Sequence, residues 1–377
     1  MHFSIVRSVL AAGLAALLGS GCAHQPQARE PDQRSGVEPL LATSGIAHVR
    51  VHEAFVSAAT PDDNVDSPAA WTAADGTTLL LATAKASGRL LRYDGDSGQA
   101  QGSVGTPGAA AGQFDRPNGI FRIDDLVFVV ERDNRRVQVL RLPQLTSLGS
   151  FGTAELQQPY GLWLRKLPDG GYDVLVSDAY MAGKDAAGDD IVPPLAQLDR
   201  RLRRYDVRVL ADGVQASLRA SLGDTGSAGA IRIPESLWGD PAYDRLLVAE
   251  EDTLTGTALR DYDLAGTFRG KTLGLGLFKA QAEGIALWQC ADGSGYWIAT
   301  DQFKDRSLFH VFDRRSLAHL GAFAGDTVAN TDGIWLHQAA TRRFAQGVFY
   351  AVHDDQAVGA FDWRDIAKAL NLKSACD

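Results

Sequence analysis

Several oxygen-bearing side chains recur at one position of this chain, immediately before a small residue and a short apolar run. The clearest members are Asn118, Tyr160, Glu235, Glu283 and Asp332. Carboxylate and amide oxygens are the ligands that hard cations such as Ca²⁺ prefer. If the fold gathers these positions around one point, we expect a site that holds a divalent cation and activates a bound water molecule.

These carboxylates also have a purely structural interpretation, because an acid at the start of a strand can accept hydrogen bonds from nearby backbone N–H groups. For Glu235, Glu283 and Asp332 we favour the ligand interpretation, since three equivalent positions share it. The neighbouring acids Glu250 and Glu251 are further candidates. We expect one of these two to be functional and the other to be a solvated turn residue.

The elements that must position these side chains recur about every 40 to 50 residues, which is the length of one β-propeller blade. Six copies are present: residues 66–71, aligned on Ala69, and the segments that begin at Pro117, Pro159, Pro234, Ala282 and Thr331. A propeller brings equivalent positions of its blades together around one axis. The sequence therefore predicts an all-β, six-bladed β-propeller with the oxygen-bearing positions at its centre.

Short β-rich stretches lie between the copies, for example residues 126–130 and 172–176, and Gly, Asp and Pro turns bound them. We expect the early strand at residues 46–51 to pair with the last blade and close the ring, because closure removes exposed strand edges. One short helix is predicted at the C-terminal end, over residues 363–370.

The composition excludes several classes of function. The net charge is −9, with 37 Lys and Arg against 46 Asp and Glu, and no basic stripe is present. This argues against a nucleic-acid partner, whose phosphates require such a stripe. The chain has no Gly-x-Ser-x-Gly nucleophile elbow, no dinucleotide-binding glycine pattern and no Cys-His spacing typical of zinc. We expect a monomer.

Residues 1–22 are predicted to be a lipoprotein-type signal peptide. A basic start precedes an apolar run over residues 8–18, which is too short to span a membrane. The following Gly19-Ser20-Gly21-Cys22 resembles a bacterial lipobox, so Cys22 is the expected lipidation site. Ala23 in place of Asp implies sorting to the outer membrane, facing the periplasm or the cell surface. An ordinary cleaved signal is the alternative.

Polar residues 23–42 are predicted to be a flexible tether, and residues 43–377 the propeller domain. Two further cysteines, Cys290 and Cys376, lie in the propeller domain. In an oxidising compartment they can form a disulfide that pins the C-terminal tail to the fifth blade. Two separate thiols are the alternative, because spacing alone does not give their distance.

In order and at blade spacing, a series of motifs resembles the β-propeller phytases, which are six-bladed, calcium-dependent phosphomonoesterases. The series covers nearly the whole chain from Asp63 to Leu370. It comprises Asp63-Asn64-Val65-Asp66-Ser67-Pro68-Ala69-Ala70-Trp71, Thr83-Ala84-Lys85, Asn134-Arg135, Tyr160-Gly161, Pro234-Glu235, Ala249-Glu250-Glu251-Asp252, Glu283-Gly284, Asp326 and Thr331-Asp332-Gly333.

The resemblance implies a role for each matching side chain. The implied metal ligands are Asp66, Glu235, Glu250, Glu251, Glu283, Asp326 and Asp332. The implied contacts to a phosphorylated substrate are Lys85, Arg135, Tyr160 and Asp178. Glu235, Glu283 and Asp332 would act in catalysis by activating a metal-bound water. Without the resemblance, Lys85 and Arg135 would be taken as solvated charges, Tyr160 as channel packing, and Asp326 equally as ligand or surface residue.

The chain departs from the phytase pattern at several positions. Ser67 stands in place of an Asp, Ser236 in place of a Gly, and Gln281 in place of an Asp near the implied metal cluster. A long insertion over residues 179–196 carries Asp185, Asp189 and Asp190. We expect this segment either to cover the site as a lid or to repel a highly phosphorylated ligand.

Three functional hypotheses follow. The first is calcium-dependent hydrolysis of a phosphomonoester, such as inositol hexakisphosphate, in the manner of a 3-phytase. The second is a non-catalytic propeller lipoprotein that binds a ligand or a protein. The third is a sugar lactonase on a similar scaffold, with one central divalent ion held by Glu283, Asn118 and Asp332.

Overall fold

The protein is described here by a computed structural model, which covers Met1, residues 39–211 and residues 213–376. The predicted signal peptide, Cys22 and most of the tether lie outside these residues. Within them, no helix is long and apolar enough to cross a membrane.

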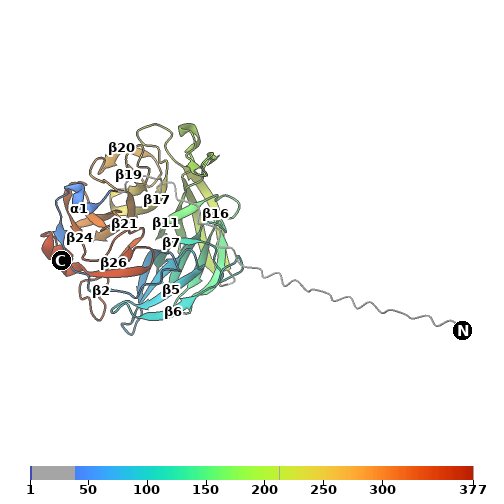
Figure 1. Cartoon of the computed structure of the whole chain (residues 1–377), viewed down its shortest axis with the longest axis horizontal. Helices are drawn as coiled ribbons and strands as arrows, with labels where there is room; N and C mark the ends of the chain where they lie inside the picture. Colours follow the sequence, from blue (N-terminus) through green and yellow to red (C-terminus); the bar gives the residue numbers. More distant parts are fainter. Residues whose placement is uncertain (2–38, 212, 377) are drawn as a thin grey trace.

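The fold is a six-bladed β-propeller, as the repeat predicted, with four antiparallel strands in each blade and a fifth, parallel strand at the edge of blade five. Seen along its shortest axis, the molecule is a ring in which β7, β11, β17 and β21 lie near the centre and β6, β16, β20 and β24 near the rim (Figure 1). The chain runs outward through each blade and then returns to the centre to begin the next.

The first three blades follow in sequence order. Blade one comprises β3 (Val65–Thr72), β4 (Thr78–Ala84), β5 (Arg89–Asp94) and β6 (Ala100–Val104). Blade two comprises β7 (Pro117–Ile123), β8 (Leu126–Glu131), β9 (Arg136–Arg141) and β10 (Thr146–Phe151). Blade three comprises β11 (Pro159–Lys166), β12 (Tyr172–Asp178), β15 (Leu202–Leu210) and β16 (Gly213–Leu222).

The last three blades complete the ring. Blade four comprises β17 (Pro234–Asp240), the 3-10 turn η2 (Pro241–Tyr243), β18 (Arg245–Glu250), β19 (Ala258–Tyr262) and β20 (Phe268–Leu273). Blade five comprises β21 (Ala282–Gln289), β22 (Gly295–Asp301), β23 (Leu308–Asp313) and β24 (His319–Ala324). Blade six comprises β25 (Ile334–His337), β26 (Val348–His353) and β27 (Ala357–Asp362).

The N-terminal part of the propeller supplies the strand that closes the ring. Strand β2 (Phe55–Val56) pairs antiparallel with β27 and completes blade six. Strand β1 (Val49–Arg50) instead pairs parallel with β24 of blade five, next to the short helix α1 (Leu41–Ser44). The predicted closure is therefore present, but its assignment to residues 46–51 was wrong, because the chain crosses blade five before it reaches blade six.

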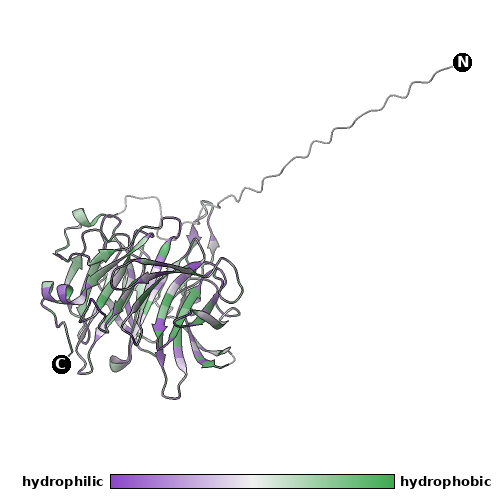
Figure 2. Ribbon diagram, turned by 90° about the horizontal axis from the view of Figure 1, so that it is seen from below, coloured by the Kyte–Doolittle hydropathy of each residue, from purple (hydrophilic) through white to green (hydrophobic). Residues whose placement is uncertain are grey.

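The middle strands are almost continuous apolar runs because both of their faces are covered by neighbouring blades. Every residue of β4 and β8 is buried, whereas the outermost strand β6 of blade one is largely exposed. Viewed from the side, apolar residues run through the strands and polar residues gather at their ends (Figure 2). Packing between blades therefore forms the core and leaves the loops at the two ends to carry chemistry.

The C-terminal helix α2 (Trp363–Ala369) confirms the predicted helix. Its N-cap is Asp362, whose side chain accepts a hydrogen bond from Arg364 N. Trp363 stacks on Trp288 of β21 with ring centroids 5.4 Å apart. A disulfide between Cys290 and Cys376 then ties the chain end to blade five, which settles the alternative that the sequence left open.

The long insertion belongs to blade three, where it separates β12 from β15. It folds back on itself as a small hairpin, β13 (Gly183–Lys184) with β14 (Asp190–Ile191), followed by the 3-10 turn η1 (Leu195–Gln197). The side chain of Asp185 accepts hydrogen bonds from Ala187 N and Asp189 N, and Asp190 pairs with Lys184. These contacts lie within the hairpin and give it a local shape of its own.

Candidate functional site

The inner strands present one side chain each to the propeller axis through a repeated irregularity. In β3, β7, β11, β17 and β21 the pairing register with the second strand shifts just after the first residue. Such a bulge bends the strand and re-aims a side chain. The residues at this point are Asp66, Asn118, Tyr160, Glu235 and Glu283, and Asp332 stands at the corresponding place before β25.

This axial ring, defined by those six residues, corrects the sequence alignment of blade one. The alignment placed Ala69 with Asn118 and Glu235, but the register shift makes Asp66 the equivalent residue. The misalignment arose because Ala70-Trp71 looks like the small and apolar pair that follows the ring position in other blades, whereas the register makes Ser67-Pro68 the equivalent pair. All six blades therefore contribute a polar side chain to the ring.

Small residues follow the ring positions because the inner strands of adjacent blades approach closely there. A Cβ atom added to Gly161 would lie 2.7 Å from the carbonyl oxygen of Glu235. Ser236, which departs from the phytase pattern, fits the same space and adds two bonds. Its hydroxyl donates to the carbonyl oxygen of Glu283 at 3.1 Å and accepts from Ile285 N at 2.9 Å. This serine therefore links blades four and five.

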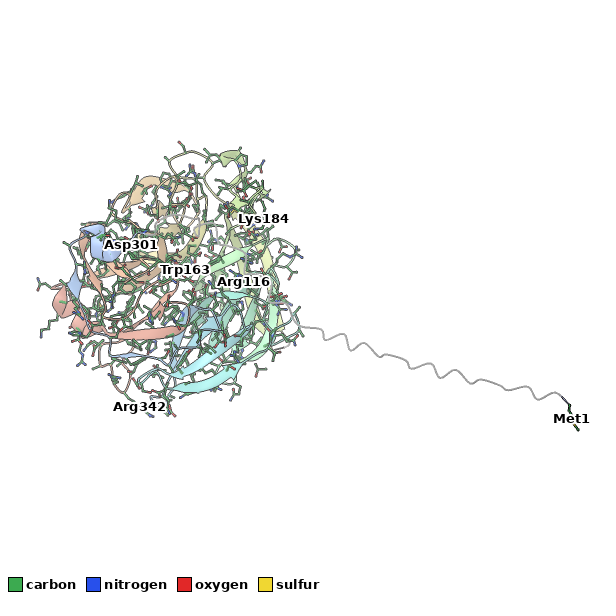
Figure 3. The ribbon with its side chains drawn as sticks, viewed as in Figure 1. Met1, Arg116, Trp163, Lys184, Asp301 and Arg342 are labelled. Carbon is green, nitrogen blue, oxygen red and sulfur yellow. A yellow bond between two sulfur atoms is a disulfide. The ribbon has the colours of Figure 1, made fainter. Side chains whose placement is uncertain are left out.

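An aromatic layer lies beneath the axial ring, three residues further along the inner strands. Phe121, Trp238 and Trp335 contact one another with ring centroids 5.2 to 5.7 Å apart. Trp163 belongs to the same level, and its label lies near the middle of the molecule in Figure 3. The central cavity, about 470 Å³ when the open solvent at its mouth is counted, thus has a polar rim of Tyr160, Glu235 and Asp332 over an apolar floor.

Lys85 lies within the axial ring and is not a solvated charge. It directly follows β4, and its Nζ atom lies 2.9 Å from Asp66 Oδ2 and 3.1 Å from Asp332 Oδ2. Burial alone would lower the pKa of Lys85, but the negative charges of Asp66 and Asp332 raise that pKa well above its usual value. Lys85 is therefore a fixed positive charge that neutralises part of this side of the ring.

Tyr160 and Gln302 make further hydrogen bonds to the two carboxylates that flank Lys85. Its phenol O–H donates to Asp66 Oδ2 at 3.4 Å. Burial, followed by the charge of Glu235, raises the pKa of Tyr160 well above its usual value, so the phenol keeps its proton. Gln302 Nε2 donates a hydrogen bond to Asp332.

Negative charge is concentrated on the opposite side of the ring. Burial raises the pKa of Glu235 well above its usual value, and the nearby charges of Glu251, Asp66 and Asp332 raise it further. Glu251 follows the end of β18 and accepts a hydrogen bond from Gln281 Nε2 at 3.2 Å. Gln281, which stands where the phytase pattern has an Asp, thus holds Glu251 without adding another negative charge. Protonation or a bound cation would relieve this crowding.

Two charged groups near the mouth were missed by the sequence analysis. Asp355 lies in the turn between β26 and β27, and burial together with the charges of Asp332 and Asp66 raises its pKa to about 7. Arg116 is buried directly before β7 and interacts electrostatically with Tyr160 and Asp332. Figure 3 shows its label near the middle of the ring. Asp355 gave no signal because Asp354-Asp355 resembles an ordinary turn, whereas the position of Arg116 before an inner strand was visible.

Glu250 and Asp178 have carboxylates that are occupied elsewhere. Glu250 accepts hydrogen bonds from Arg232 N at 2.7 Å and Ile233 N at 2.9 Å, and Asp178 accepts from Gln158 N at 2.8 Å. Both end a second strand and hold the loop that enters the inner strand. These contacts give both acids a structural role. One of Glu250 and Glu251 was expected to be a solvated turn residue, but both are buried.

Asp326 and Arg135 are also separate from the axial ring. The carboxylate of Asp326 contacts Arg50 and His52 of the N-terminal segment. Arg135 is exposed, has a positive φ of 52°, and lines a cleft on the outer side of the loops. The sequence could not separate them from the axial residues, because their distance from the axis depends on the lengths and paths of the loops.

Asn118 provides a direct test of whether the ring suits a cation. Its side chain is fully buried, and neither its amide oxygen nor its amide nitrogen has a hydrogen-bond partner. An orphaned amide of this kind is costly unless a ligand satisfies it. Among the described residues, His, Cys, Asp and Glu side chains alone form no group of three or more placed to hold a metal ion. A cation here would therefore need the Asn118 oxygen and a rearrangement of the acids.

Comparisons with known proteins agree on the fold. No protein-family model matches the chain, and no curated protein matches its sequence. A solved structure of a calcium-binding protein, regucalcin from Agrobacterium tumefaciens, is similar with a TM-score of 0.50 and 12% identity, over 84% of this chain and 95% of that one. This likeness supports the six-bladed propeller.

Two further solved structures match with lower scores. A nidogen/laminin complex gives a TM-score of 0.42 at 13% identity, over 74% of this chain and 86% of that one. Hydrazine synthase from Kuenenia stuttgartiensis gives a TM-score of 0.44 at 10% identity, over 84% of this chain and 82% of that one.

Proposed function

We propose that the axial ring binds a divalent cation, with Ca²⁺ as the first candidate, and hydrolyses a small ester of the sugar-lactone class. The observation that carries this proposal is the ring itself, where carboxylates from four blades and a fully buried, unsatisfied amide occupy equivalent positions of the inner strands. Carboxylate and amide oxygens are a hard donor set suited to Ca²⁺. That regucalcin, a calcium-binding protein, has a similar fold supports the choice of ion.

Glu283, Asn118 and Asp332 are the residues that we expect to hold the ion. Bound there, it would polarise the ester carbonyl and make a coordinated water more acidic. The chain's own groups supply the proton transfers. Asp355, with a pKa of about 7, can accept a proton near neutral pH, and protonated Glu235 can donate one to the leaving alcohol. Tyr160 remains protonated and can donate a hydrogen bond to the substrate.

Phosphomonoester hydrolysis, the activity implied by the phytase resemblance, is the second candidate. It is favoured by Arg132, which lines a pocket together with Tyr160 and Glu235. We place it second because the two predicted phosphate contacts are not available at the axis. Lys85 is held between two carboxylates, and Arg135 lines the outer cleft.

A substrate panel of sugar lactones, phytate and nucleotides, assayed with Ca²⁺ and with EDTA, tests both candidates. We expect lactone hydrolysis that EDTA abolishes. Hydrolysis of phytate or nucleotides without lactone hydrolysis would select the second candidate. Turnover that survives EDTA would contradict the metal mechanism. No turnover together with a Ca²⁺-dependent rise in melting temperature would select a non-catalytic binding propeller.

We further propose that the protein is exported, lipidated at Cys22 and anchored as a monomer to the outer membrane, with no nucleic-acid partner. The disulfide between Cys290 and Cys376 supports an oxidising compartment. Cell fractionation with metabolic fatty-acid labelling tests the anchor. Label should be incorporated into the unmodified chain and be absent from Cys22→Ser, and label retained by that variant would contradict the assignment.

A further inference from the structure

Three cavities form a continuous row from the axis towards the outer side of blades two and three. The central cavity shares Tyr160 and Glu235 with a side pocket of about 410 Å³. The side pocket shares Gln158 and Met181 with an open outer cleft of about 1140 Å³. The adjoining pockets therefore give a direction in which a substrate longer than the central cavity would extend from the axis.

The charge of the lining changes sign along this row. The central cavity is lined by Glu235 and Asp332. The side pocket is mixed, because Arg132 lines it together with Glu251 and Asp190. The outer cleft is lined by Arg135, Arg200 and Arg203, with Glu155 as the acidic member of its lining. Such a reversal suits a ligand whose two ends differ, with a neutral reacting group at the cation site and an anion at the far end.

Arg203 is a buried arginine in the lining of the outer cleft, unlike a solvated arginine of the protein surface. It is only 5% exposed, and its guanidinium donates to Ser221 Oγ at 2.6 Å. Its Nε atom lies 3.6 Å from Asp178 Oδ2, beyond hydrogen-bond distance, and has no hydrogen-bond partner. The same carboxylate that holds the entry to β11 therefore orients this arginine without saturating it.

The loop of residues 154–158 and the two ends of the β12–β15 connection supply most of the cleft lining. Tyr180 and Met181 begin the insertion, and Arg200 lies where the chain returns to β15. The guanidinium of Arg200 lies over the Tyr180 ring, 5.1 Å from its centroid, which limits the freedom of an otherwise half-exposed side chain. The hairpin acids Asp185 and Asp190 are engaged within the insertion itself. The insertion thus contributes the ring of Tyr180, which positions Arg200 in the cleft, and the arginines themselves lie outside the insertion.

We propose that Arg135, Arg200 and Arg203 form a distal anion subsite that binds the carboxylate or phosphate group of the substrate while its ester lies at the axial ring. The role of the ester rests on the proposed function, whereas anion binding by the cleft does not. Guanidinium groups present several N–H donors that match the paired oxygens of such anions. The substrate class is therefore an anionic lactone or ester.

The first test measures anion binding without any hydrolysis. Inorganic phosphate and succinate are titrated separately into the full chain in EDTA by isothermal calorimetry, against Arg135→Ala/Arg200→Ala. We expect at least one anion to bind, with about tenfold weaker affinity in the double variant, as the loss of a charge-assisted contact implies. Arg141→Ala is the matched control, because Arg141 is a partly exposed arginine paired with Asp125 outside the cleft.

The outcomes of the titration are decisive. Binding of phosphate alone or succinate alone identifies which anion the subsite takes. Absence of binding for both anions, unchanged affinity in the double variant, or an equal loss in Arg141→Ala would each overturn the subsite.

The second test links the subsite to turnover. The double variant should raise KM about tenfold for a carboxylated lactone while leaving KM for an uncharged lactone unchanged, with kcat similar in both cases. An equal rise for both substrates would overturn the distal role. If no lactone is hydrolysed but the calorimetric difference is present, the proposed function fails and the anion subsite stands.

Discussion

Two sets of buried carboxylates in this propeller differ in what surrounds them. The axial acids, represented by the buried Glu235 and Asp66, lie close to other charged groups of the ring. The loop-holding acids at the ends of the second strands are Glu131, Asp178, Glu250 and Asp301. Each of these accepts at least one backbone N–H from the loop entering the inner strand, such as Ala280 N on Asp301 at 2.8 Å.

The two sets of carboxylates differ in what compensates the cost of burying their charge. A carboxylate that receives backbone N–H groups is compensated by the fold itself. A carboxylate that faces further carboxylates is costly to the fold and is relieved by protonation, by a cation such as Lys85, or by a bound ion. The two sets are also connected, because each loop-holding acid fixes the entry of a strand whose second residue belongs to the axial ring.

The largest expected effect is on activity. Glu283→Gln removes a carboxylate that we expect to hold the ion, and should lower kcat/KM by about 10³-fold. Its free energy of unfolding should change by less than about 1 kcal/mol, because Gln has nearly the same shape and keeps a side-chain oxygen that can accept hydrogen bonds. Steady-state kinetics with Ca²⁺ and urea unfolding measure both quantities. Near-normal activity would remove Glu283 from the ion site.

The adjacent pair Glu250 and Glu251 sharpens the comparison most directly. Glu250→Ala leaves the N–H groups of Arg232 and Ile233 without their acceptor, and should lower the free energy of unfolding by about 3 kcal/mol. Glu251→Ala should cost less than about 1 kcal/mol and weaken Ca²⁺ binding instead. Urea unfolding and Ca²⁺ calorimetry test the pair. A larger stability loss for Glu251→Ala would reverse the assignment of the two acids.

His337 is a buried base, in contrast to the buried carboxylic acids above. Its Nε2 atom lies 2.8 Å from Thr72 Oγ1, and burial lowers its pKa to about 4. In the unfolded chain His337 takes up a proton near pH 6.5, whereas in the folded chain it does so only near pH 4. The free energy of unfolding is therefore highest above pH 6.5 and falls as the pH is lowered towards 4. We expect a loss of about 3 kcal/mol over that window. Urea unfolding should show that His337→Gln reduces the slope, and an unchanged slope would contradict this source.

The smallest expected effect is a gain in the free energy of unfolding on Glu235→Gln. Because the pKa of Glu235 is raised, its negative charge opposes folding, and the penalty grows as the pH rises above the pKa of the unfolded chain. In EDTA at pH 8, Glu235→Gln should therefore raise the free energy of unfolding by about 1 kcal/mol. The gain should shrink towards pH 5, and thermal melts at both values test it. Destabilisation at pH 8 would show that Glu235 is compensated like Glu250.

Much of the site could be predicted because the repeat makes equivalent positions visible. The structure places Glu235, Asp332, Tyr160 and Lys85 at the axial mouth, where the sequence analysis expected them. Glu250 and Glu251 illustrate the limit, since two identical side chains differ only in the direction that a strand end gives them. Asp355 reaches the mouth through a turn of blade six, and no local pattern marks that turn as central.

The amino-acid sequence by itself determined that this chain forms six blades with polar residues at the inner strand starts. Strand patterns and turn residues are local, and their repetition is readable without coordinates. The tertiary structure alone decided which acids meet one another and which are held by backbone N–H groups. That difference depends on register shifts, loop paths and neighbouring blades, and these arise only when distant segments pack together.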